Sequence, residues 1–440
     1  MVDLKGDPSI KETMRELKRI YQSFRQVLRR IIPLAWRRRV VRLWRGETRE
    51  VIESKWQPIG PLARMMERTV FADYDIVCFP VIDWDFRFQR PQQLMLRMAQ
   101  AGHRVFYLSQ HFRTEGDPVM VYPHAPNLYE VSLRGNPQSI YTESLDKKAL
   151  ERLFSSISTL RQECRLGSTL ALVQLPFWWP LVHRTRELFG WKVLYDCMDY
   201  HSGFTLNHPE MLQVEDELLA QADLVIVSSI FLERQARPHN PKISIVRNGC
   251  DYPHFSQVPA DIFSAADNRR PVIGYYGAIA DWFDADLVAD LAERRPDWDL
   301  ILIGSTVSAD ISRLSNMSNV TLAGEQPYQS LPSWLRTIDV LIIPFKRNEL
   351  TEATNPVKAY EILAAGKPLV SVPLPEVVAL GPIVQLASTA EEFEREILQA
   401  IQTNSLEKTE ERRRFAAEHT WEERVASLEP RIRDLFHQRQ

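Results

Sequence analysis

The feature that most constrains the fold is a series of short apolar runs that alternate with amphipathic stretches. An apolar run at Asp75–Ile82 is followed by a helical pattern over Arg90–Ala101, which ends at Gly102, and then by a second apolar run at Arg104–Ser109. Four more strand-like runs follow: Thr169–Leu175, Val193–Asp196, Leu224–Ser229 and Ile243–Arg247. Because helical stretches separate most of these runs, the pattern predicts parallel strands joined by crossover helices, which is a doubly wound α/β sheet.

A second series of the same kind begins after a loop-rich stretch near residues 251–270. Its predicted strands are Val272–Tyr276, Asp299–Gly304, Val320–Ala323, Asp339–Pro344 and Leu369–Val372, and its helices are Asp284–Arg294, Leu331–Arg336 and Pro356–Ala364. We therefore expect two Rossmann-like domains, residues 71–255 and 271–405, followed by charged helices over 406–440. Two such sheets imply a cleft at the carboxyl ends of their strands, where ligands bind in open α/β sheets.

The pattern over residues 1–70 predicts a basic helical extension. The first fifty residues hold fourteen Lys and Arg against six Asp and Glu, whereas the whole chain has a net charge of −3. Apolar residues recur there at helical spacing, and Trp36 and Trp44 are flanked by arginines. The arm either packs on the body or lies on an anionic membrane surface, and no nucleic-acid-binding motif accompanies it.

The sequence carries no sign of a secreted or membrane-spanning protein. The four cysteines form no C-x-x-C pair, and no run reaches the 18 apolar residues of a membrane span. The expectation is a cytoplasmic protein, either free or peripheral on the inner face of a membrane.

The strongest local motif is TNPVKAYE at residues 354–361, followed by AAGKP at 364–368. Asn355 is a suitable N-cap, and Pro356 suits the first helical turn. The free N–H groups and dipole of such a helix favour a diphosphate, and Lys358 adds charge. The carboxylate of Glu361 could accept both hydroxyls of a ribose. The alternative is a capped structural helix with a solvated Glu.

Polar residues also follow strands in the first domain. Asp83, Trp84, Arg87 and Arg90 come after the first strand, where a loop would face an acceptor; alternatively they are surface charges around a helix start. After the strand at Val193–Asp196 come Asp199 and His201, either of which could orient or deprotonate an acceptor hydroxyl, or be structural.

Other ligand classes lack their motifs. The metal-binding D-x-D triplet occurs four times at unrelated places, starting at Asp73, Asp83, Asp284 and Asp297, which shows how unspecific it is. We expect no essential metal. The G-x-G-x-x-G and G-x-x-x-x-G-K-[ST] patterns are both missing, which argues against a dehydrogenase or a P-loop NTPase.

Five segments in the correct order resemble glycosyltransferases of the two-Rossmann-domain (GT-B) fold, especially those related to family 4. They are DFRFQRPQQLMLRMAQAGHRVFYLS, ADLVIVSSIFLERQ, IVRNGCDYPHF, VIGYYGAIADWFD and PFKRNELTEATNPVKAYEILAAGKPLVS. The resemblance covers roughly residues 71–430. It implies that Glu361 holds the nucleotide ribose of a sugar donor. Thr354, Arg347 and Gly277 are further candidates on the donor side.

This chain departs from family 4 at two places. The second Glu of the family motif, eight residues earlier, is Ala353 here. The Arg and Lys that usually follow the VIGYYG strand are replaced by Ala278, Asp281 and Trp282.

The resulting hypothesis is glycosyl transfer from a nucleotide sugar to a hydroxyl of a glycan or lipid-linked acceptor, in cell-surface polysaccharide biosynthesis. The resemblance also implies retention of the anomeric configuration. Asp83, Asp199 and His201 are the candidate catalytic residues, and no cofactor is expected. The alternatives are a nucleotide-sugar epimerase of the same fold and a nucleotide-binding scaffold without catalysis.

Overall fold

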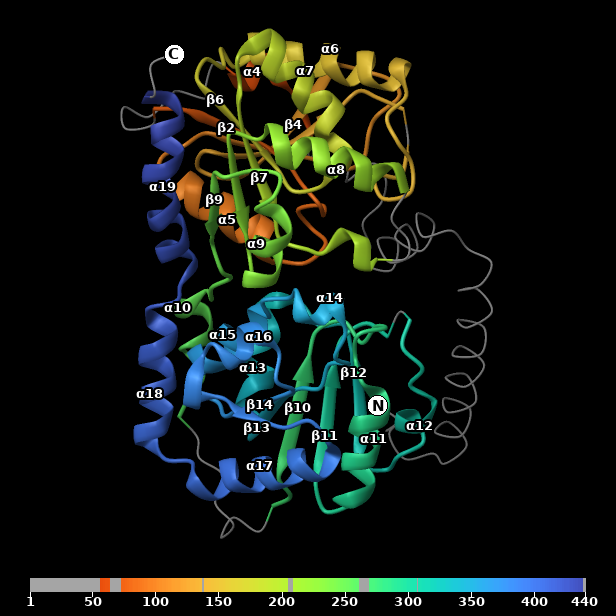
Figure 1. Cartoon of the computed structure of the whole chain (residues 1–440), viewed down its shortest axis with the longest axis vertical. Helices are drawn as coiled ribbons and strands as arrows, with labels where there is room; N and C mark the ends of the chain where they lie inside the picture. The colour runs from red at the N-terminus through yellow and green to blue at the C-terminus, as the bar shows by residue number, and fades with distance from the viewer. Residues whose placement is uncertain are drawn as a thin grey trace, which may run out of the picture. The chain divides into compact units, whose positions relative to one another are not determined.

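Two sheets organise the chain, as the alternation of strands and helices predicts (Figure 1). The computed structural model describes residues 56–63, 73–136, 138–204, 209–260, 269–306 and 308–437. Residues from Pro58 onward belong to one compact unit. The basic arm over residues 1–50 lies outside the described residues, so its packing stays a prediction.

The first sheet contains the strand order β4-β5-β3-β2-β6-β7-β8-β9. Its strands are β2 (Asp75–Phe79), β3 (Val105–Leu108), β4 (Val119–Ala125), β5 (Leu128–Leu133), β6 (Thr169–Val173), β7 (Lys192–Cys197), β8 (Leu224–Val227) and β9 (Ile243–Ile245), and a two-residue strand β1 (Gln57–Pro58) precedes them. Strand β2 pairs in parallel with both β3 and β6, and the parallel pairing continues through β7, β8 and β9. The strand order therefore reverses beside β2.

The sequence pattern missed an antiparallel hairpin in this sheet. Strands β4 and β5 pair antiparallel, from Val119 opposite Leu133 to Ala125 opposite Leu128. The turn between them places Asn127 in the left-handed region with φ 63°. Asparagine tolerates this conformation better than most residues, which allows so short a connection.

Helices cover both faces of the first sheet because alternate side chains of each strand point to opposite faces. On β2, Ile76 and Cys78 join a core with α5 (Arg90–Gln100), whereas Val77 and Phe79 join a core with α6 (Lys147–Glu163). The other helices around this sheet are α4 (Ile59–Ala63), α7 (Trp179–Phe189), α8 (Pro209–Gln221) and α9 (Ile230–Ala236), with short 3₁₀ turns η1 (Pro176–Trp178) and η2 (His201–Gly203). Helix α10 (Tyr252–Phe255) follows in the chain, but its Phe255 joins the core of the second sheet.

The second sheet has the order β12-β11-β10-β13-β14-β15, with every neighbouring pair parallel. Its strands are β10 (Val272–Tyr276), β11 (Asp299–Ile303), β12 (Val320–Gly324), β13 (Val340–Ile343), β14 (Leu369–Ser371) and β15 (Gln385–Leu386). The strand order reverses between β10 and β13. In such sheets the carboxyl edge at the reversal is the usual ligand site.

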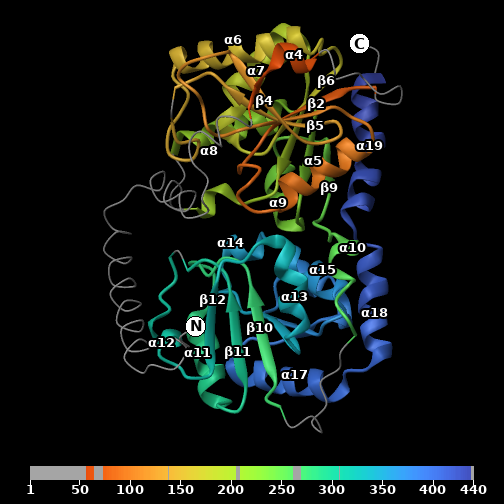
Figure 2. The same ribbon diagram turned by 180° about the vertical axis from the view of Figure 1, so that it is seen from behind.

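The helices of the second part are α11 (Ala285–Arg294), α12 (Ser312–Ser315), α13 (Leu331–Arg336), α14 (Glu349–Glu352), α15 (Val357–Ala364), α16 (Pro375–Val378) and α17 (Ala390–Thr403), with 3₁₀ turns η4 (Tyr328–Ser330) and η5 (Gly381–Ile383). Two further helices, α18 (Leu406–Ala417) and α19 (Trp421–His437), end the described chain. Helix α18 packs on α15, whereas α19 packs on α5 and contributes Trp421 and Leu428 to the core of the first sheet (Figure 2). Helix α18 thus packs with the second sheet, and α19 returns to pack on the first.

Candidate functional site

Helix α15 begins at the carboxyl edge of the second sheet, beside the reversal between β10 and β13. The prediction that Asn355 caps this helix is wrong. The N-cap is Pro356, with φ −70° and ψ 111°, and no side chain bonds to the first turn. The first N–H groups of α15 therefore point out of the helix end, where the positive end of its dipole lies.

The reason for the different cap is that Asn355 is used elsewhere. Its side-chain oxygen accepts a hydrogen bond from the backbone N–H of Asn248 at 2.8 Å, and its amide nitrogen donates to Tyr360 and Glu376 at 3.2 and 3.3 Å. Asn355 is only 3% exposed. Asn355 therefore holds the segment that precedes the helix and does not cap the first helical turn.

Lys358 places a partly buried amine at this helix end. Its Nζ donates to the Tyr275 hydroxyl at 3.1 Å and lies 4.4 and 4.8 Å from the ring centroids of Tyr275 and Phe345. Burial lowers the pKa of Lys358 to about 7, opposed by the charge of Glu361. Gly277 has a φ of 128°, a conformation that favours glycine, and a Cβ there would lie 2.6 Å from the Lys358 Nζ.

Glu361 lies one turn further into the same helix and is 5% exposed. One carboxylate oxygen accepts a hydrogen bond from the Tyr276 hydroxyl at 2.8 Å. Burial raises the pKa of Glu361 to about 7, while the Tyr276 hydrogen bond and the charge of Lys358 lower it. The amine of Lys358, a helix N-terminus and the carboxyl group of Glu361 thus lie together, a combination that suits a phosphate next to hydroxyl groups.

The other two donor-side candidates lie near the same helix but face local partners. Thr354 donates from its hydroxyl to the Leu350 carbonyl at 2.8 Å. Arg347 is half exposed and lies 3.7 Å from a carboxylate oxygen of Glu352.

The loop after β2 holds three of the acceptor-side candidates. The buried carboxylate of Asp83 accepts a hydrogen bond from the backbone of Gln110 and pairs with the exposed imidazole of His111 at 3.1 Å. Trp84 stacks on the His124 ring at a centroid distance of 4.7 Å. Arg87 reaches across to the second part of the chain, where its Nε lies 2.7 Å from a carboxylate oxygen of Glu325. The charge of Arg87 also lowers the pKa of Lys358, which burial lowers most and the charge of Glu361 raises.

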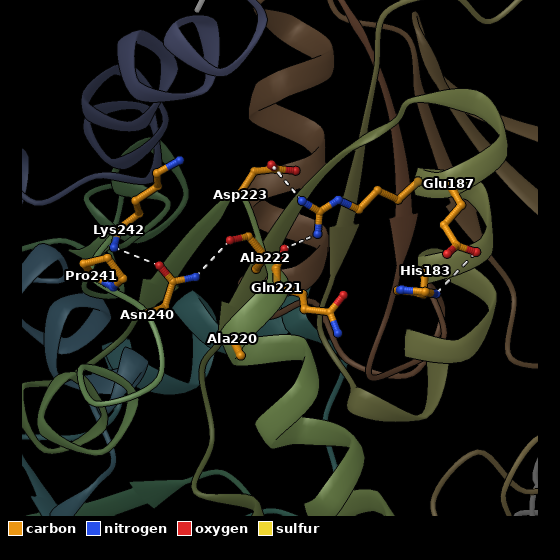
Figure 3. Close-up of a pocket in the computed structure, with 10 residues that line it drawn as sticks. His183, Glu187, Ala220, Gln221, Ala222, Asp223, Asn240, Pro241 and Lys242 are labelled. Carbon is orange, nitrogen blue, oxygen red and sulfur yellow. Dashed lines mark hydrogen bonds and ion pairs between the residues drawn. The ribbon is translucent and has the colours of Figure 1, made fainter. Parts of the chain in front are cut away.

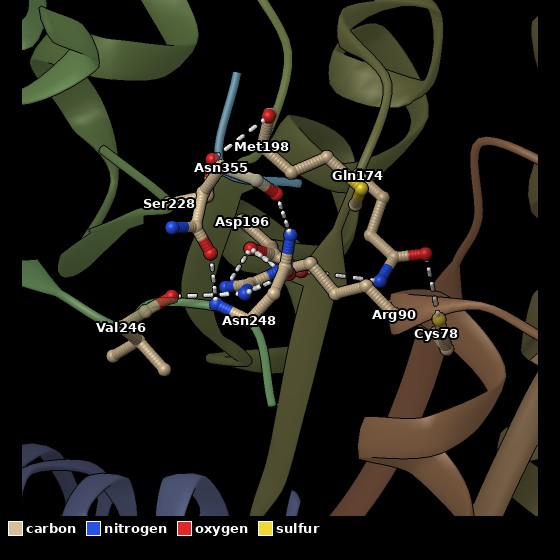
Figure 4. A network of polar contacts seen from close by, with 9 residues as sticks. All are labelled: Cys78, Arg90, Gln174, Asp196, Met198, Ser228, Val246, Asn248 and Asn355. Carbon is tan, nitrogen blue, oxygen red and sulfur yellow. Dashed lines mark hydrogen bonds and ion pairs between the residues drawn. The ribbon is translucent and has the colours of Figure 1, made fainter. Parts of the chain in front are cut away.

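Arg90 differs from the rest of that loop because it is buried at the start of α5. Its guanidinium binds both carboxylate oxygens of Asp196 at 2.8 to 3.1 Å and donates to the Val246 carbonyl and the Asn248 side chain (Figure 4). Arg90 is 3% exposed and Asp196 is fully buried. The structure therefore places Arg90 in a polar network inside the protein rather than on an open surface.

Asp199 and His201 follow β7 at the carboxyl edge of the first sheet. Burial, followed by the charge of Asp196, raises the pKa of Asp199 to about 6. Burial lowers the pKa of His201 to about 4, so its imidazole is neutral at pH 7. Asp199 is therefore mostly ionised at neutral pH and can accept a proton, and His201 can stabilise no anion by charge.

Replacing Glu361 with Gln should change how stability depends on pH. Because the pKa of Glu361 is raised from 4.5 to about 7 in the folded state, ionisation of Glu361 removes stability from the wild-type protein as the pH rises through this range, and the Gln variant lacks this contribution. From pH 5 to pH 8 the variant should gain on the order of 2 kcal/mol relative to wild type. Unfolding in urea at both pH values measures this.

Glu215 provides a matched comparison for that experiment. It accepts a hydrogen bond from the buried Tyr195 hydroxyl at 2.7 Å, and burial raises its pKa to about 7 as well. Glu215→Gln should therefore show the same pH-dependent gain. A gain that is equal at pH 5 and pH 8 would contradict the raised pKa.

A surface pocket with a volume of about 650 Å³ lies at the other edge of the first sheet. It is lined by residues that precede β8 and β9, including Asp223 and Asn240 (Figure 3). Its Arg186 pairs with Asp223, and its His183 pairs with Glu187. This pocket is remote in topology from the carboxyl edges and does not include any predicted site residue.

The D-x-D carboxylates mostly serve structural pairs. Asp75 binds Arg104, Asp286 binds Arg313, Asp297 binds Arg295, Asp299 binds Arg270, and Asp284 caps α11. In the part of the chain that the structure describes, no group of three or more His, Cys, Asp or Glu is arranged to hold a metal ion. The four cysteines are buried free thiols. No helix within the described ranges combines the length and apolar character needed to cross a membrane.

Sequence reasoning missed the residues that surround the two charged groups of α15. Tyr275, Tyr276 and Phe345 were assigned only to strands or to motif segments, although their hydroxyls and rings hold Lys358 and Glu361. The pair of tyrosines at the carboxyl end of β10 is the signal that could have found them, since a buried tyrosine hydroxyl needs a partner.

Comparison with known proteins agrees with this architecture. Residues 270–403 match the family model described as Glycosyl transferases group 1. TuaH of Bacillus subtilis (strain 168), whose name assigns it to teichuronic acid biosynthesis as a glycosyltransferase, is 28% identical over 209 residues, which is 43% of this chain. The match spans 52% of TuaH, about half of its length.

Solved structures extend the likeness to both sheets. Sucrose-phosphate synthase from Thermosynechococcus elongatus has a TM-score of 0.64 at 17% identity, covering 82% of this chain and 99% of that one. The catalytic domain of starch synthase IV from Arabidopsis thaliana, bound to ADP and acarbose, has a TM-score of 0.60 at 11% identity, covering 83% and 99%. The predicted fold is thereby confirmed: the chain has the GT-B fold of glycosyltransferases, and its residues 270–403 match the Glycosyl transferases group 1 family.

Proposed function

We propose that this protein transfers a glycosyl unit from a nucleotide sugar to a hydroxyl of a glycan or lipid-linked acceptor, in the biosynthesis of a cell-surface polysaccharide. The observation that carries the proposal is that Lys358 and Glu361 both lie near the start of α15, within the residues that match the group 1 family. The relation to TuaH supports the polysaccharide setting.

The proposed donor site uses each group for a separate part of the nucleotide. The carboxylate of Glu361 accepts hydrogen bonds from the ribose hydroxyls. The first N–H groups of α15, Lys358 and Arg87 face the diphosphate, and Thr354 and Arg347 flank it. In the transfer step the bond between the anomeric carbon and the diphosphate breaks and a bond to the acceptor oxygen forms, so these cations stabilise the charge that builds up on the leaving group.

The acceptor side is assigned to the loops after β2 and β7. Asp83, Trp84 and Arg87 belong to the first loop, and Asp199 and His201 to the second. Asp199, with its pKa of about 6, is the strongest candidate to take the acceptor proton. The transferred unit is proposed to be a hexose or related sugar, with retention of its configuration.

A binding screen tests the donor assignment. The purified full chain is titrated by calorimetry with UDP, GDP, ADP, dTDP and CMP, each in buffer with and without EDTA. We expect one nucleotide to bind well above the others, with the same affinity in EDTA, because no metal is needed in the proposed site. Binding that disappears in EDTA and returns with Mg²⁺ or Mn²⁺ would overturn the metal-free proposal.

Two other functions fit parts of the same site. A nucleotide-sugar epimerase would change its donor in the absence of any acceptor. A non-catalytic scaffold would bind nucleotide and turn over nothing; the absence of Arg and Lys after β10, where Ala278, Asp281 and Trp282 stand, is the feature that favours it.

The basic arm is proposed to dock the protein on the inner membrane face, beside a lipid-linked acceptor. Each Lys or Arg close to an anionic surface contributes about 1 kcal/mol, and Trp36 and Trp44 suit the interface. The full chain should sediment with anionic liposomes at low salt and much less at high salt. Failure to sediment at either salt concentration would contradict this role.

A further inference from the structure

A polar network connects the first sheet to the start of α15. Asn248, which follows β9, donates from its backbone N–H to the Asn355 side-chain oxygen at 2.8 Å and from its amide to the Asn355 carbonyl at 2.6 Å. Asn355 is followed directly by Pro356, the N-cap of α15. Two hydrogen bonds from one side therefore define where the donor helix begins.

Asn248 is itself held in place from the first sheet. Its side-chain oxygen accepts from Arg90 at 3.0 Å, and its carbonyl accepts from Arg424 of α19 at 3.1 Å. Arg90 is fixed by the fully buried Asp196, which also receives a hydrogen bond from Gln174 (Figure 4). The path from β7 to α15 therefore runs through Asn248.

Glu376 holds Asn355 from a second side. Glu376 accepts from the Asn355 amide at 3.3 Å, from the backbone N–H of Ile230 at 2.8 Å and from Arg247 at 2.6 Å. Ile230 is the first residue of α9 in the first part of the chain. Asn355 is thus held between residues 247–248 and Glu376, and its position cannot change without breaking several buried hydrogen bonds.

We propose that Asn248 is a positioning residue of the donor site, which holds the anion-binding end of α15 against the first sheet. This proposal rests on the proposed function, because it assigns Asn248 to nucleotide binding by α15. Asn248 touches no nucleotide in this account. It acts through Asn355 and Pro356, so that Lys358 and the first N–H groups of the helix face the diphosphate.

The test compares Asn248 with a matched asparagine, Asn240. Asn240 is also buried, donates from its amide to two backbone carbonyls, Leu219 and Ala222, at 2.8 and 2.9 Å, and accepts from the Lys242 backbone (Figure 3). It lies at the opposite edge of the first sheet. The same substitution at the two positions therefore removes similar hydrogen bonds, of which only one set leads to α15.

The experiment uses the full chain and the nucleotide that binds best in the calorimetric screen. Asn248→Asp removes the donor to the Asn355 carbonyl, and Asn248→Ser removes the amide without adding a charge; Asn240→Asp and Asn240→Ser are their controls. We expect the Asn248 variants to bind the nucleotide about tenfold more weakly than wild type, and the Asn240 variants to stay within about twofold, although both pairs melt at lower temperature.

Hydrogen exchange of the first turn of α15 gives a readout that needs no nucleotide. The amide of Ala359, which donates to the Pro356 carbonyl at 3.1 Å, should exchange faster in Asn248→Ser than in Asn240→Ser. Equal affinities and equal exchange in the two pairs would overturn the positioning role and leave the proposed function standing. If the wild-type protein binds none of the nucleotides, the proposed function itself fails, and the role of Asn248 in it fails as well.

Discussion

Replacing Glu361 with Gln is expected to weaken nucleotide binding at least tenfold while the protein remains folded. In the proposed site the Glu361 carboxylate accepts two hydrogen bonds from ribose hydroxyls, and hydrogen bonds to a charged group contribute about 1.5–3 kcal/mol each. The Gln side chain can still accept from Tyr276, which lies 2.8 Å from the carboxylate, so the local structure should survive. Calorimetric titration of both proteins with the preferred nucleotide measures the loss.

Glu215→Gln is again the matched control for this affinity measurement. The two glutamates share a buried tyrosine partner and a pKa raised to about 7, and Glu215 lies on α8, outside the proposed donor site. Glu215→Gln should bind nucleotide like wild type. If Glu361→Gln also kept its affinity, Glu361 would have no place in the nucleotide site.

The second large effect concerns the buried pair of Arg90 and Asp196. Asp196→Asn leaves the Arg90 guanidinium without its countercharge inside the protein, and breaking a buried pair in this way costs about 3–5 kcal/mol. Asp297→Asn is the control, because Asp297 binds Arg295 in a similar two-point geometry but its side chain is 59% exposed. An exposed pair contributes only about 0–1 kcal/mol.

Urea unfolding followed by circular dichroism compares these two variants. The midpoint for Asp196→Asn should fall well below that of Asp297→Asn, which should stay close to wild type. Equal midpoints would mean that the Arg90 network contributes little to stability, and would weaken the view that it anchors α15.

The sequence predicted most strands and helices because their patterns are local. Val272–Tyr276 and Leu331–Arg336 were predicted with the bounds that the structure has. A buried strand and a short amphipathic helix can each be recognised from a few neighbouring residues. The β4–β5 hairpin was missed because its turn depends on Asn127 in the left-handed region, which differs from the usual two-residue hairpin signals.

The roles of Asn355 and Glu361 could not be predicted because they depend on contacts with residues far away in the sequence. Asn355 looks like an N-cap from its neighbours alone, yet its partner Asn248 is 107 residues away. Glu361 looks solvated on a helical wheel, but Tyr276, 85 residues away, gives it a buried partner. The donor-side candidates Lys358, Glu361 and Gly277 were chosen by motif, and only the fold shows how close Lys358 lies to Gly277.

A transfer assay tests the central claim most directly. The purified full chain is incubated with the sugar donor of the nucleotide it binds best, with and without a lipid-linked or polysaccharide acceptor, and the products are followed by mass spectrometry. The proposed function predicts nucleoside diphosphate release that depends on the acceptor, an acceptor heavier by one sugar unit, and loss of both in Glu361→Gln. A donor that is altered without any acceptor, or nucleotide binding with no product under all conditions, would contradict glycosyl transfer.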